Sequence, residues 1–163
     1  MFLFKVVLAI FPFFNLLGEP VLSLTPPPDF SLKAEVAAVL PLIQDQVLLL
    51  QRVPTHPQAN LWCSPGGKMI PGETPSIAAA RELKEETDIE VDATALISLG
   101  KFYVRYPNGD YIFHLFKTHL LSLPEVKIDP QEHQSYCLCP LQDVSSLALT
   151  PGLDECIELA LKP

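Results

Sequence analysis

Basic residues are scarce in this chain of 163 residues, which carries 11 Lys and Arg against 19 Asp and Glu and a formal net charge of −8 at pH 7. No long run of basic residues occurs. Because a surface that grips duplex nucleic acid needs clustered positive charge, we expect no duplex nucleic acid as a partner. The acidic balance instead favours a metal ion or a ligand bridged by a cation.

Cysteine and histidine are too scattered for a zinc centre. Cys137 and Cys139 form a C-x-C inside an apolar run, without a second pair at zinc-site spacing, and the histidines share no metal-binding spacing. We therefore expect buried reduced thiols rather than disulfides or a cysteine-bound metal. The cysteines of the chain are Cys63, Cys137, Cys139 and Cys156, and its histidines are His56, His114, His119 and His133.

The chain also lacks an apolar run of comfortable length for a permanent transmembrane helix. The apolar core of its first residues, Val6–Leu17, follows Lys5 and is interrupted by Pro12 and Asn15. This outline is typical of a signal peptide, so membrane contact is expected only through residues 1–23. Export, a loose membrane anchor and a start chosen too far upstream all stay open.

One domain is expected after this segment. The Pro-rich stretch Thr25–Phe30 is stiff by composition and marks the boundary, so that residues 1–30 hold the apolar segment and a linker. Residues 31–163 then form the domain, because a chain of this length with 48% hydrophobic residues supports one real core and not two. No internal repeat occurs.

The pattern of apolar runs predicts an α/β (α+β) fold. Strand-length runs occur at residues 33–43, 46–52, 96–120 and 135–141. The first two flank a turn at Gln44 and Asp45, and Asn108-Gly109 is a strong hairpin signal within the third. Because strands, a helix, more strands and a second helix follow one another, we expect a mixed β-sheet sandwiched between helices.

Two helices are predicted from their start signals. Thr74 followed by Pro75 begins the first, which spans about Pro75–Thr87. The second is expected to have Thr150 as its N-cap and Pro151 at its first position, with one apolar face.

The first helix carries three carboxylates on one face. Glu82, Glu85 and Glu86 stand at i, i+3 and i+4, within an arc of about 100°. The neighbouring face, expected to pack, holds Ala79, Ala80 and Leu83. Carboxylates this close repel one another, and a divalent cation would remove that penalty. Oxygen ligands alone suit Mg²⁺ or Mn²⁺, and Mg²⁺ commonly bridges carboxylates to substrate phosphates.

These carboxylates belong to a longer array with the spacing G-x5-E-x7-R-E-U-x-E-E, in which Leu83 is the apolar residue U. Its fixed positions are Gly67, Glu73, Arg81, Glu82, Glu85 and Glu86. Six fixed positions match by chance at a frequency on the order of 10⁻⁷ per register. The array is the Nudix box, and over about Lys33–Lys162 the chain resembles the Nudix hydrolase family, most closely its MutT-type nucleoside triphosphate pyrophosphohydrolases.

The resemblance implies a Nudix fold and a role for each residue of the box. Glu82, Glu85 and Glu86 would ligate a divalent metal, with the carbonyl of Gly66 completing the inner shell. Arg81 and Glu73 look like the pair that braces the loop against the helix. Glu132 matches a loop position that often supplies a further ligand or a base, although an ordinary solvated residue fits it equally well. The choice between Glu82 and Glu132 as base stays open.

One position departs from the family pattern, because Asp88 stands where the box ends in glycine. That glycine occupies a left-handed helix exit, and aspartate is among the least costly substitutes there. We expect a small cost in stability and unchanged chemistry.

Substrate identity is less well specified. Arg52 and Lys68 are candidate phosphate contacts, with ordinary surface charge as the alternative. Asp154 is the polar residue in the loop where MutT-type enzymes place a base-reading group. Four aromatic residues are candidates for stacking a base, although strand aromatics more often belong to the core: Trp62, Tyr106, Tyr111 and Phe113.

The expected activity is metal-dependent hydrolysis of a small nucleotide, a nucleoside diphosphate linked to some moiety X. The leading candidate substrate is a nucleoside triphosphate, which would yield a monophosphate and pyrophosphate. Nucleotide sugars such as ADP-ribose and dinucleotide polyphosphates are the alternative substrates. A non-catalytic nucleotide sensor is disfavoured because all three box glutamates are present. Nucleotides, Mg²⁺ and unpaired cysteines point to the cytoplasm, against the apolar N-terminal segment. The oligomeric state stays open.

Overall fold

The computed structural model describes residues 22–106 and 108–162. The N-terminal apolar run on which we base the expectation of export or anchoring lies outside the described residues. Within the described ranges, no helix is long and apolar enough to cross a membrane.

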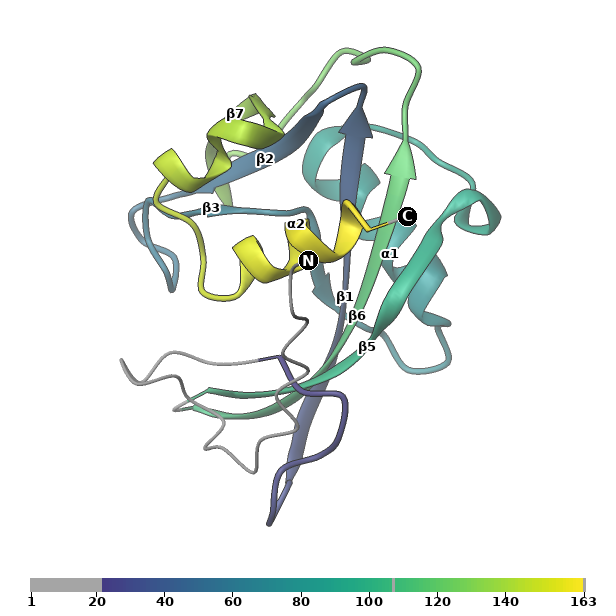
Figure 1. The fold of residues 1–163 in the computed structure, drawn as a ribbon, viewed down its shortest axis with the longest axis vertical. Coiled ribbons are helices and arrows are strands. Elements are labelled where there is room, and N and C mark those ends of the chain that lie inside the picture. Colours follow the sequence, from purple (N-terminus) through teal and green to yellow (C-terminus); the bar gives the residue numbers. More distant parts are fainter. Residues whose placement is uncertain (1–21, 107, 163) are drawn as a thin grey trace, which may run out of the picture.

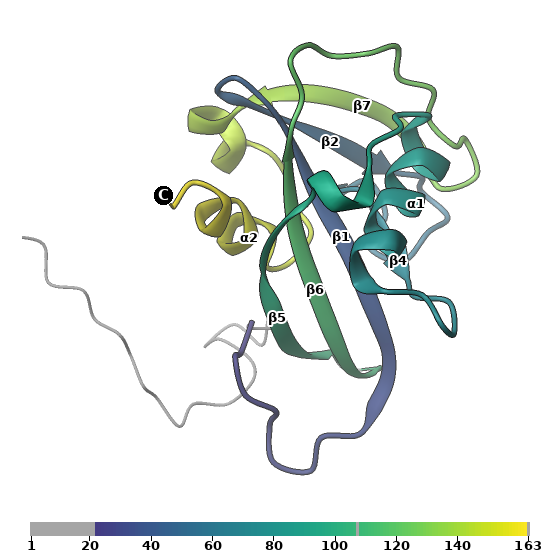
Figure 2. The same cartoon turned by 90° about the vertical axis from the view of Figure 1, so that its right-hand side faces the viewer.

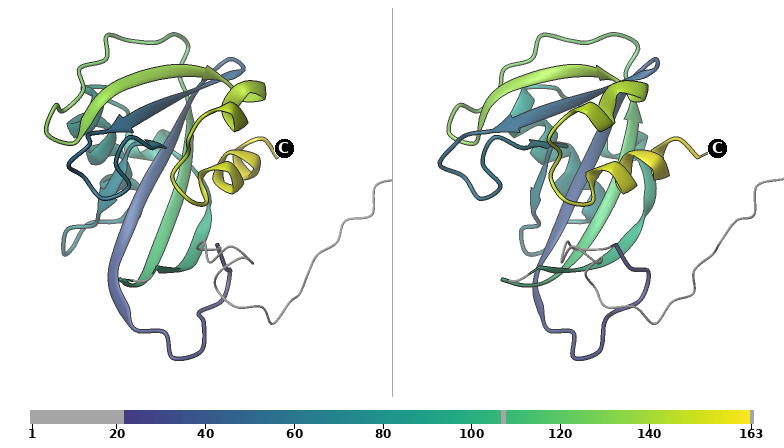
Figure 3. Two further views of the ribbon diagram at one scale, coloured as in Figure 1. Left: turned by 90° about the vertical axis from the view of Figure 1, so that its left-hand side faces the viewer. Right: turned by 60° about the vertical axis from the view of Figure 1, so that its left-hand side comes forward.

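A seven-stranded mixed sheet forms the centre of the domain (Figure 1). The strands are β1 (Leu32–Ile43), β2 (Gln46–Arg52), β3 (Trp62–Cys63), β4 (Gly66–Lys68), β5 (Ile97–Tyr106), β6 (Gly109–His119) and β7 (His133–Pro140). They follow the order β3-β2-β1-β6-β5, with β4 paired to β1 and β7 paired to β2. The pairing of β7 with β2 can be followed in both views of Figure 3.

Helices lie on both sides of this sheet. Figure 2 shows β1 and β6 between α1 (Pro75–Thr87) and α2 (Leu153–Ala160). Two short 3₁₀ helices, η1 (Ala93–Ala95) and η2 (Leu141–Ser146), complete the described elements. The prediction of a mixed sheet sandwiched between helices is confirmed.

The central strand β1 is buried on both faces. Its side chains alternate, so that Ala37 and Val39 pack against Leu83 of α1, whereas Leu40 and Leu42 join the core under α2. A strand covered on both sides reads as a continuous apolar run, as the sequence of β1 does. Within α1, Ala78 is buried together with Ala79 and Leu83, whereas Ala80, expected on the packing face, is only partly covered.

Both predicted hairpins form. Leu42 pairs with Val47 across the β1–β2 turn, where Gln44 takes a φ of 56°. At the β5–β6 hairpin Tyr106 pairs with Gly109, so Gly109 begins β6 instead of lying at the centre of the turn. Its φ of 143° still requires a residue without a side chain.

The start of α2 differs from the sequence-based prediction. The helix begins at Leu153 with Gly152 as N-cap, whereas we expected Thr150 as N-cap and Pro151 as the first residue. The reason is that Leu149 bridges to Trp62, and the Thr150 N–H donates to the Trp62 carbonyl at 2.8 Å. This pairing keeps the chain extended as far as Thr150, and a turn at Pro151 and Gly152, with a φ of 83° at Gly152, then leads into the helix.

Candidate active site

Two glycines allow β4 to approach its neighbours closely. A Cβ atom on Gly67 would lie 2.6 Å from the carboxylate of Glu82 on α1, and one on Gly66 would lie 2.5 Å from the Cβ of Ala38 on β1. Neither glycine has a left-handed φ, so the requirement is for space. The glycine pair therefore brings the β4 backbone against the carboxylate face of α1.

Glu86 is the most deeply buried carboxylate of that face, with 5% of its surface exposed. Its Oε2 accepts a hydrogen bond from the Gly66 N–H at 3.1 Å. Burial raises the pKa of Glu86 to about 8; the Gly66 hydrogen bond opposes this rise, and the charges of Glu82 and Glu132 add to it. Burial likewise raises the pKa of Glu82, against the effect of Arg81. Burial thus disfavours the ionised form of both carboxylates.

Arg81 connects α1 to the loop before it. Its Nε and Nη2 donate to the two carboxylate oxygens of Glu73 at 2.7 and 3.1 Å, and Nη2 also donates to the Lys68 carbonyl at 3.1 Å. Its Nη1 donates to Glu82 at 2.7 Å and to Glu85 at 2.9 Å. Arg81 therefore contacts Glu73 in the preceding loop and supplies positive charge between Glu82 and Glu85.

The side chains of the box fit a divalent cation by their chemistry. As they are arranged here, no three His, Cys, Asp or Glu side chains in residues 22–106 and 108–162 converge on one metal position. The Glu82 and Glu86 carboxylates nevertheless meet the same glycine pair, and burial raises both pKa values, so a cation bound there would favour their ionised forms. Carboxylate and carbonyl oxygens without nitrogen or sulfur suit Mg²⁺ or Mn²⁺.

Glu132 approaches the box from the loop before β7. Its side chain is exposed, and its charge contributes to the raised pKa values of Glu82 and Glu86. The same loop is tied to α1, because Asp129 N–H donates to the Glu86 carbonyl at 3.3 Å and Lys127 N–H donates to that of Thr87 at 2.9 Å. Glu132 is therefore within electrostatic reach of the box.

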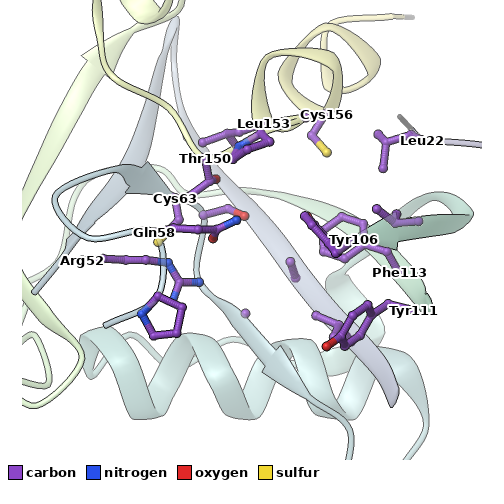
Figure 4. Close-up of a pocket in the computed structure, with 18 of the residues that line it drawn as sticks. Leu22, Arg52, Gln58, Cys63, Tyr106, Tyr111, Phe113, Thr150, Leu153 and Cys156 are labelled. Atoms are coloured by element: carbon purple, nitrogen blue, oxygen red, sulfur yellow. The ribbon is translucent and has the colours of Figure 1, made fainter. Parts of the chain in front are cut away.

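A pocket of about 590 Å³ opens beside the box. Arg52 and Cys63 lie at one end, and Tyr106, Tyr111 and Phe113 lie at the other (Figure 4). Thr150, Leu153 and Cys156 line a further side, and Gly66, whose N–H binds Glu86, also belongs to the lining. Of the predicted substrate residues, only Arg52 lines the pocket, because Lys68 and Asp154 are exposed elsewhere. Three of the four candidate aromatics line it, whereas Trp62 packs against the core.

Some pocket residues carried no signal in the sequence. Gln58 lines the pocket from the loop between β2 and β3, where it takes a φ of 61°. That loop has no periodicity from which its course could be predicted. Cys156 and Leu22 also line the pocket; the first looked like an ordinary core residue, and the second precedes the boundary that we placed at Thr25–Phe30.

Arg52 is the permanently charged residue of the pocket wall. Its Nη1 contacts His56 Nδ1 at 2.8 Å, and its Nε is buried without a hydrogen-bond partner among the described residues. Because the residue lines the pocket, its positive charge favours an anionic group there.

Cys63 and His133 do not form an activated nucleophile. Their Sγ and Nε2 atoms lie 3.7 Å apart, but burial raises the pKa of Cys63 to about 12 and lowers that of His133 to about 4. The thiol therefore stays protonated and the imidazole neutral, so chemistry at this site falls to the carboxylates.

The family model of the NUDIX domain matches residues 32–160. The chain is a Nudix hydrolase. The CTP pyrophosphohydrolase of Escherichia coli (strain K12) is 29% identical to it over 120 residues, which cover 72% of this chain and 84% of that protein. YvcI of Bacillus subtilis (strain 168), an uncharacterized Nudix hydrolase, is 28% identical over 121 residues, covering 72% and 73%.

Solved structures show the same fold. The MutT NUDIX hydrolase from Burkholderia pseudomallei superposes with a TM-score of 0.69 at 22% identity and covers 77% of this Nudix chain and 96% of its own. The E. coli ORF135 protein gives a TM-score of 0.63 at 27% identity, covering 84% and 94%. Nudix enzymes generally depend on divalent metal ions, and a Francisella tularensis relative was solved with AMP and a Mn ion.

Asp88 takes the left-handed conformation expected of the last box position, with a φ of 61° and a ψ of 12°. Its carboxylate accepts from Lys127 Nζ at 3.0 Å in an exposed ion pair, which contributes little. We expect Asp88→Gly to stabilise the Nudix domain by a few tenths to about 1 kcal/mol and Asp88→Ala to destabilise it by about 1 kcal/mol. Urea unfolding measures both; a large loss of turnover in Asp88→Gly would instead assign this aspartate a functional role.

Proposed function

We propose that this Nudix hydrolase is a divalent-metal-dependent pyrophosphohydrolase that converts a nucleoside triphosphate into a nucleoside monophosphate and pyrophosphate. The observation that carries the proposal is the pocket itself. One end brings Arg52 and Gly66 beside the buried carboxylates of the box, and the other end is aromatic. A nucleotide has the same polarity, with charged phosphates at one end and a planar base at the other.

The residues of the box would bind the cation, and one carboxylate would accept a proton. Glu82, Glu85, Glu86 and the Gly66 carbonyl would hold the cation, with Glu132 as a further ligand or as the base. A bound divalent cation neutralises phosphate charge and polarises the phosphorus centre for attack. Arg52 would pair with a phosphate oxygen, because its guanidinium lies in the pocket wall and can donate to an anion.

Hydrolysis requires one carboxylate to accept a proton from water. The water oxygen forms a bond to the α-phosphorus, the P–O bond bridging the α- and β-phosphates breaks, and the leaving pyrophosphate takes the electron pair. Glu82 and Glu132 both qualify as the acceptor. Glu82 lies between Arg81 and the glycine pair, and its pKa is raised by burial, which makes its carboxylate more basic. Glu132 lies on an exposed loop and can reach a solvent-side water.

A substrate panel with Mg²⁺ or Mn²⁺ tests the proposal. We expect at least one nucleoside triphosphate, with CTP included because of the E. coli relative, to release pyrophosphate in a reaction that EDTA stops. ADP-ribose and a diadenosine polyphosphate serve as competing substrates. If only one of these is cleaved, or if triphosphates release only inorganic phosphate, the proposed specificity is wrong.

A further inference from the structure

Residues 22–31 precede the region that the family model matches, and one of them, Leu22, lines the pocket. The first anchor of this segment is Ser23. Its N–H donates to the Tyr103 carbonyl at 3.1 Å, and the Tyr103 N–H donates to the Ser23 carbonyl at 2.7 Å. Further along, the ring of Phe30 packs edge-to-face on Tyr103 with 5.3 Å between centroids. The segment is therefore paired to the outer strand β5.

The second anchor is Asp110 at the start of β6. Its Oδ2 accepts from the Ser31 N–H at 2.8 Å, and its two carboxylate oxygens accept from Arg105 at 2.6 and 2.9 Å. Arg105 Nη2 also reaches the carbonyls of Pro28 and Asp29 at 3.2 and 3.4 Å. Asp110 is 5% exposed. Because both ends of the segment are fixed by hydrogen bonds, it forms a strap across the β5–β6 hairpin.

Leu22 is the residue that the strap contributes to the pocket. It is partly buried against the core under α2 and lines the aromatic end together with Phe113 and Cys156 (Figure 4). The next apolar residue of the strap, Leu24, is 76% exposed and does not line the pocket. Leu22 and Leu24 therefore differ in two respects, because Leu22 contacts both the core under α2 and the pocket, whereas Leu24 contacts neither.

The aromatic end suits an uncharged planar ring. Among the described residues that line the pocket, Arg52 is the permanently charged side chain, and it lies at the box end. Tyr106 and Tyr111 form an edge-to-face pair with 5.7 Å between centroids, and they offer hydroxyl groups beside apolar walls. Lys33 Nζ lies 5.9 Å from the Tyr111 ring centroid but does not line the pocket, and a nucleobase stacks on aromatic rings without a charged partner.

We propose that the strap, residues 22–31, closes the base end of the pocket and that Leu22 contacts the nucleobase, so that a segment outside the Nudix core sets the affinity for the nucleoside. This inference rests on the proposed function. It assigns Leu22 to substrate binding and leaves the reaction at phosphorus to the box.

Leu22→Ala and Leu24→Ala in the full chain form a matched test. For the best triphosphate of the panel we expect Leu22→Ala to raise KM about three- to tenfold with kcat unchanged, because a contact of equal strength in ground and transition states is lost. Inhibition by the nucleoside monophosphate product should weaken by the same factor. Inhibition by pyrophosphate should stay unchanged, since pyrophosphate occupies the box end. Leu24→Ala should match the wild type throughout.

Leu22→Trp provides an independent readout. A larger side chain narrows the base end, so the ratio of kcat/KM for a purine triphosphate to that for a pyrimidine triphosphate should fall, with no change in Leu24→Trp. The role of the strap would be overturned if both Leu22 variants had the same KM as the wild type and the same inhibition by the nucleoside monophosphate. Equal weakening of monophosphate and pyrophosphate inhibition would overturn it too, because it would indicate general damage. Absence of triphosphate hydrolysis by the wild type would instead refute the proposed function.

Discussion

Replacing Glu86 by glutamine is expected to lower metal-dependent turnover by roughly 10²-fold or more, because a neutral amide is a poor ligand for Mg²⁺. The fold should survive. Glu86 is buried beside Glu82, and an amide oxygen can still accept the hydrogen bond from the Gly66 N–H. Without metal, the variant should therefore have a higher Tm than the wild type, since a buried carboxylate near other carboxylates no longer needs to be accommodated.

Metal titration followed by thermal unfolding separates ligand loss from general damage. Mg²⁺ should raise the Tm of the wild type, by the linkage between binding and stability, and should leave the Tm of Glu86→Gln nearly unchanged. Glu90→Gln is the matched control, because Glu90 undergoes the same chemical change just beyond the helix while being exposed and paired with Lys84. Turnover of Glu86→Gln equal to the wild type at subsaturating Mg²⁺ would remove Glu86 from the proposed ligand set.

Substituting alanine for each of the two glycines of β4 should damage different properties. In Gly67→Ala the new methyl group meets the carboxylate of Glu82 at the end of a flexible side chain, which can move aside. Stability should change little, but displacement of a catalytic group by about 1 Å can cost about 10²-fold in turnover. In Gly66→Ala the methyl group meets the Cα and Cβ of Ala38 and the Ala37 carbonyl, which cannot move without separating β4 from β1.

Gly66→Ala should accordingly lower the free energy of unfolding by about 1–3 kcal/mol, as overpacking does. Thermal unfolding and turnover measured side by side on the two variants decide the matter. A Gly67→Ala enzyme with wild-type turnover would show that the position of the Glu82 carboxylate is unimportant. A Gly67→Ala enzyme that loses as much stability as Gly66→Ala would show that both glycines serve packing alone.

The parts of the site that could be predicted are those that depend on residues close together in the sequence. Helix α1, which carries most of the Nudix box, could be predicted from Pro75 to Thr87. Its start signal, its apolar spacing and its end at Asp88 all lie within a short stretch of sequence. The side-chain arrangement on that helix followed from 3.6 residues per turn, with the exception that Ala78 takes the buried position expected for Ala80.

The parts that escaped prediction depend on contacts between distant segments. The parallel pairing of β1 with β6 has no local signal, and it brings the aromatic residues of β6 beside β1. The start of α2 was displaced by pairing between Leu149 and Trp62, which is likewise non-local. Arg52 could be proposed as a phosphate contact from its place at the end of a strand, but its depth in the pocket depends on loops that lack periodicity.

The parallel pairing of β1 with β6 also bears on how the protein folds. The β1–β2 and β5–β6 hairpins are local in sequence, whereas Ala34 and Tyr111, which pair across β1 and β6, lie far apart along the chain. Closing so long a loop costs conformational entropy, and contacts between the strands compensate that cost only after the loop has closed. Topologies of this kind therefore fold slowly. Helix α1 lies in the chain segment between Ala34 and Tyr111. We therefore expect the two hairpins to form first and the carboxylates of α1 to reach their final places only when the hairpins join.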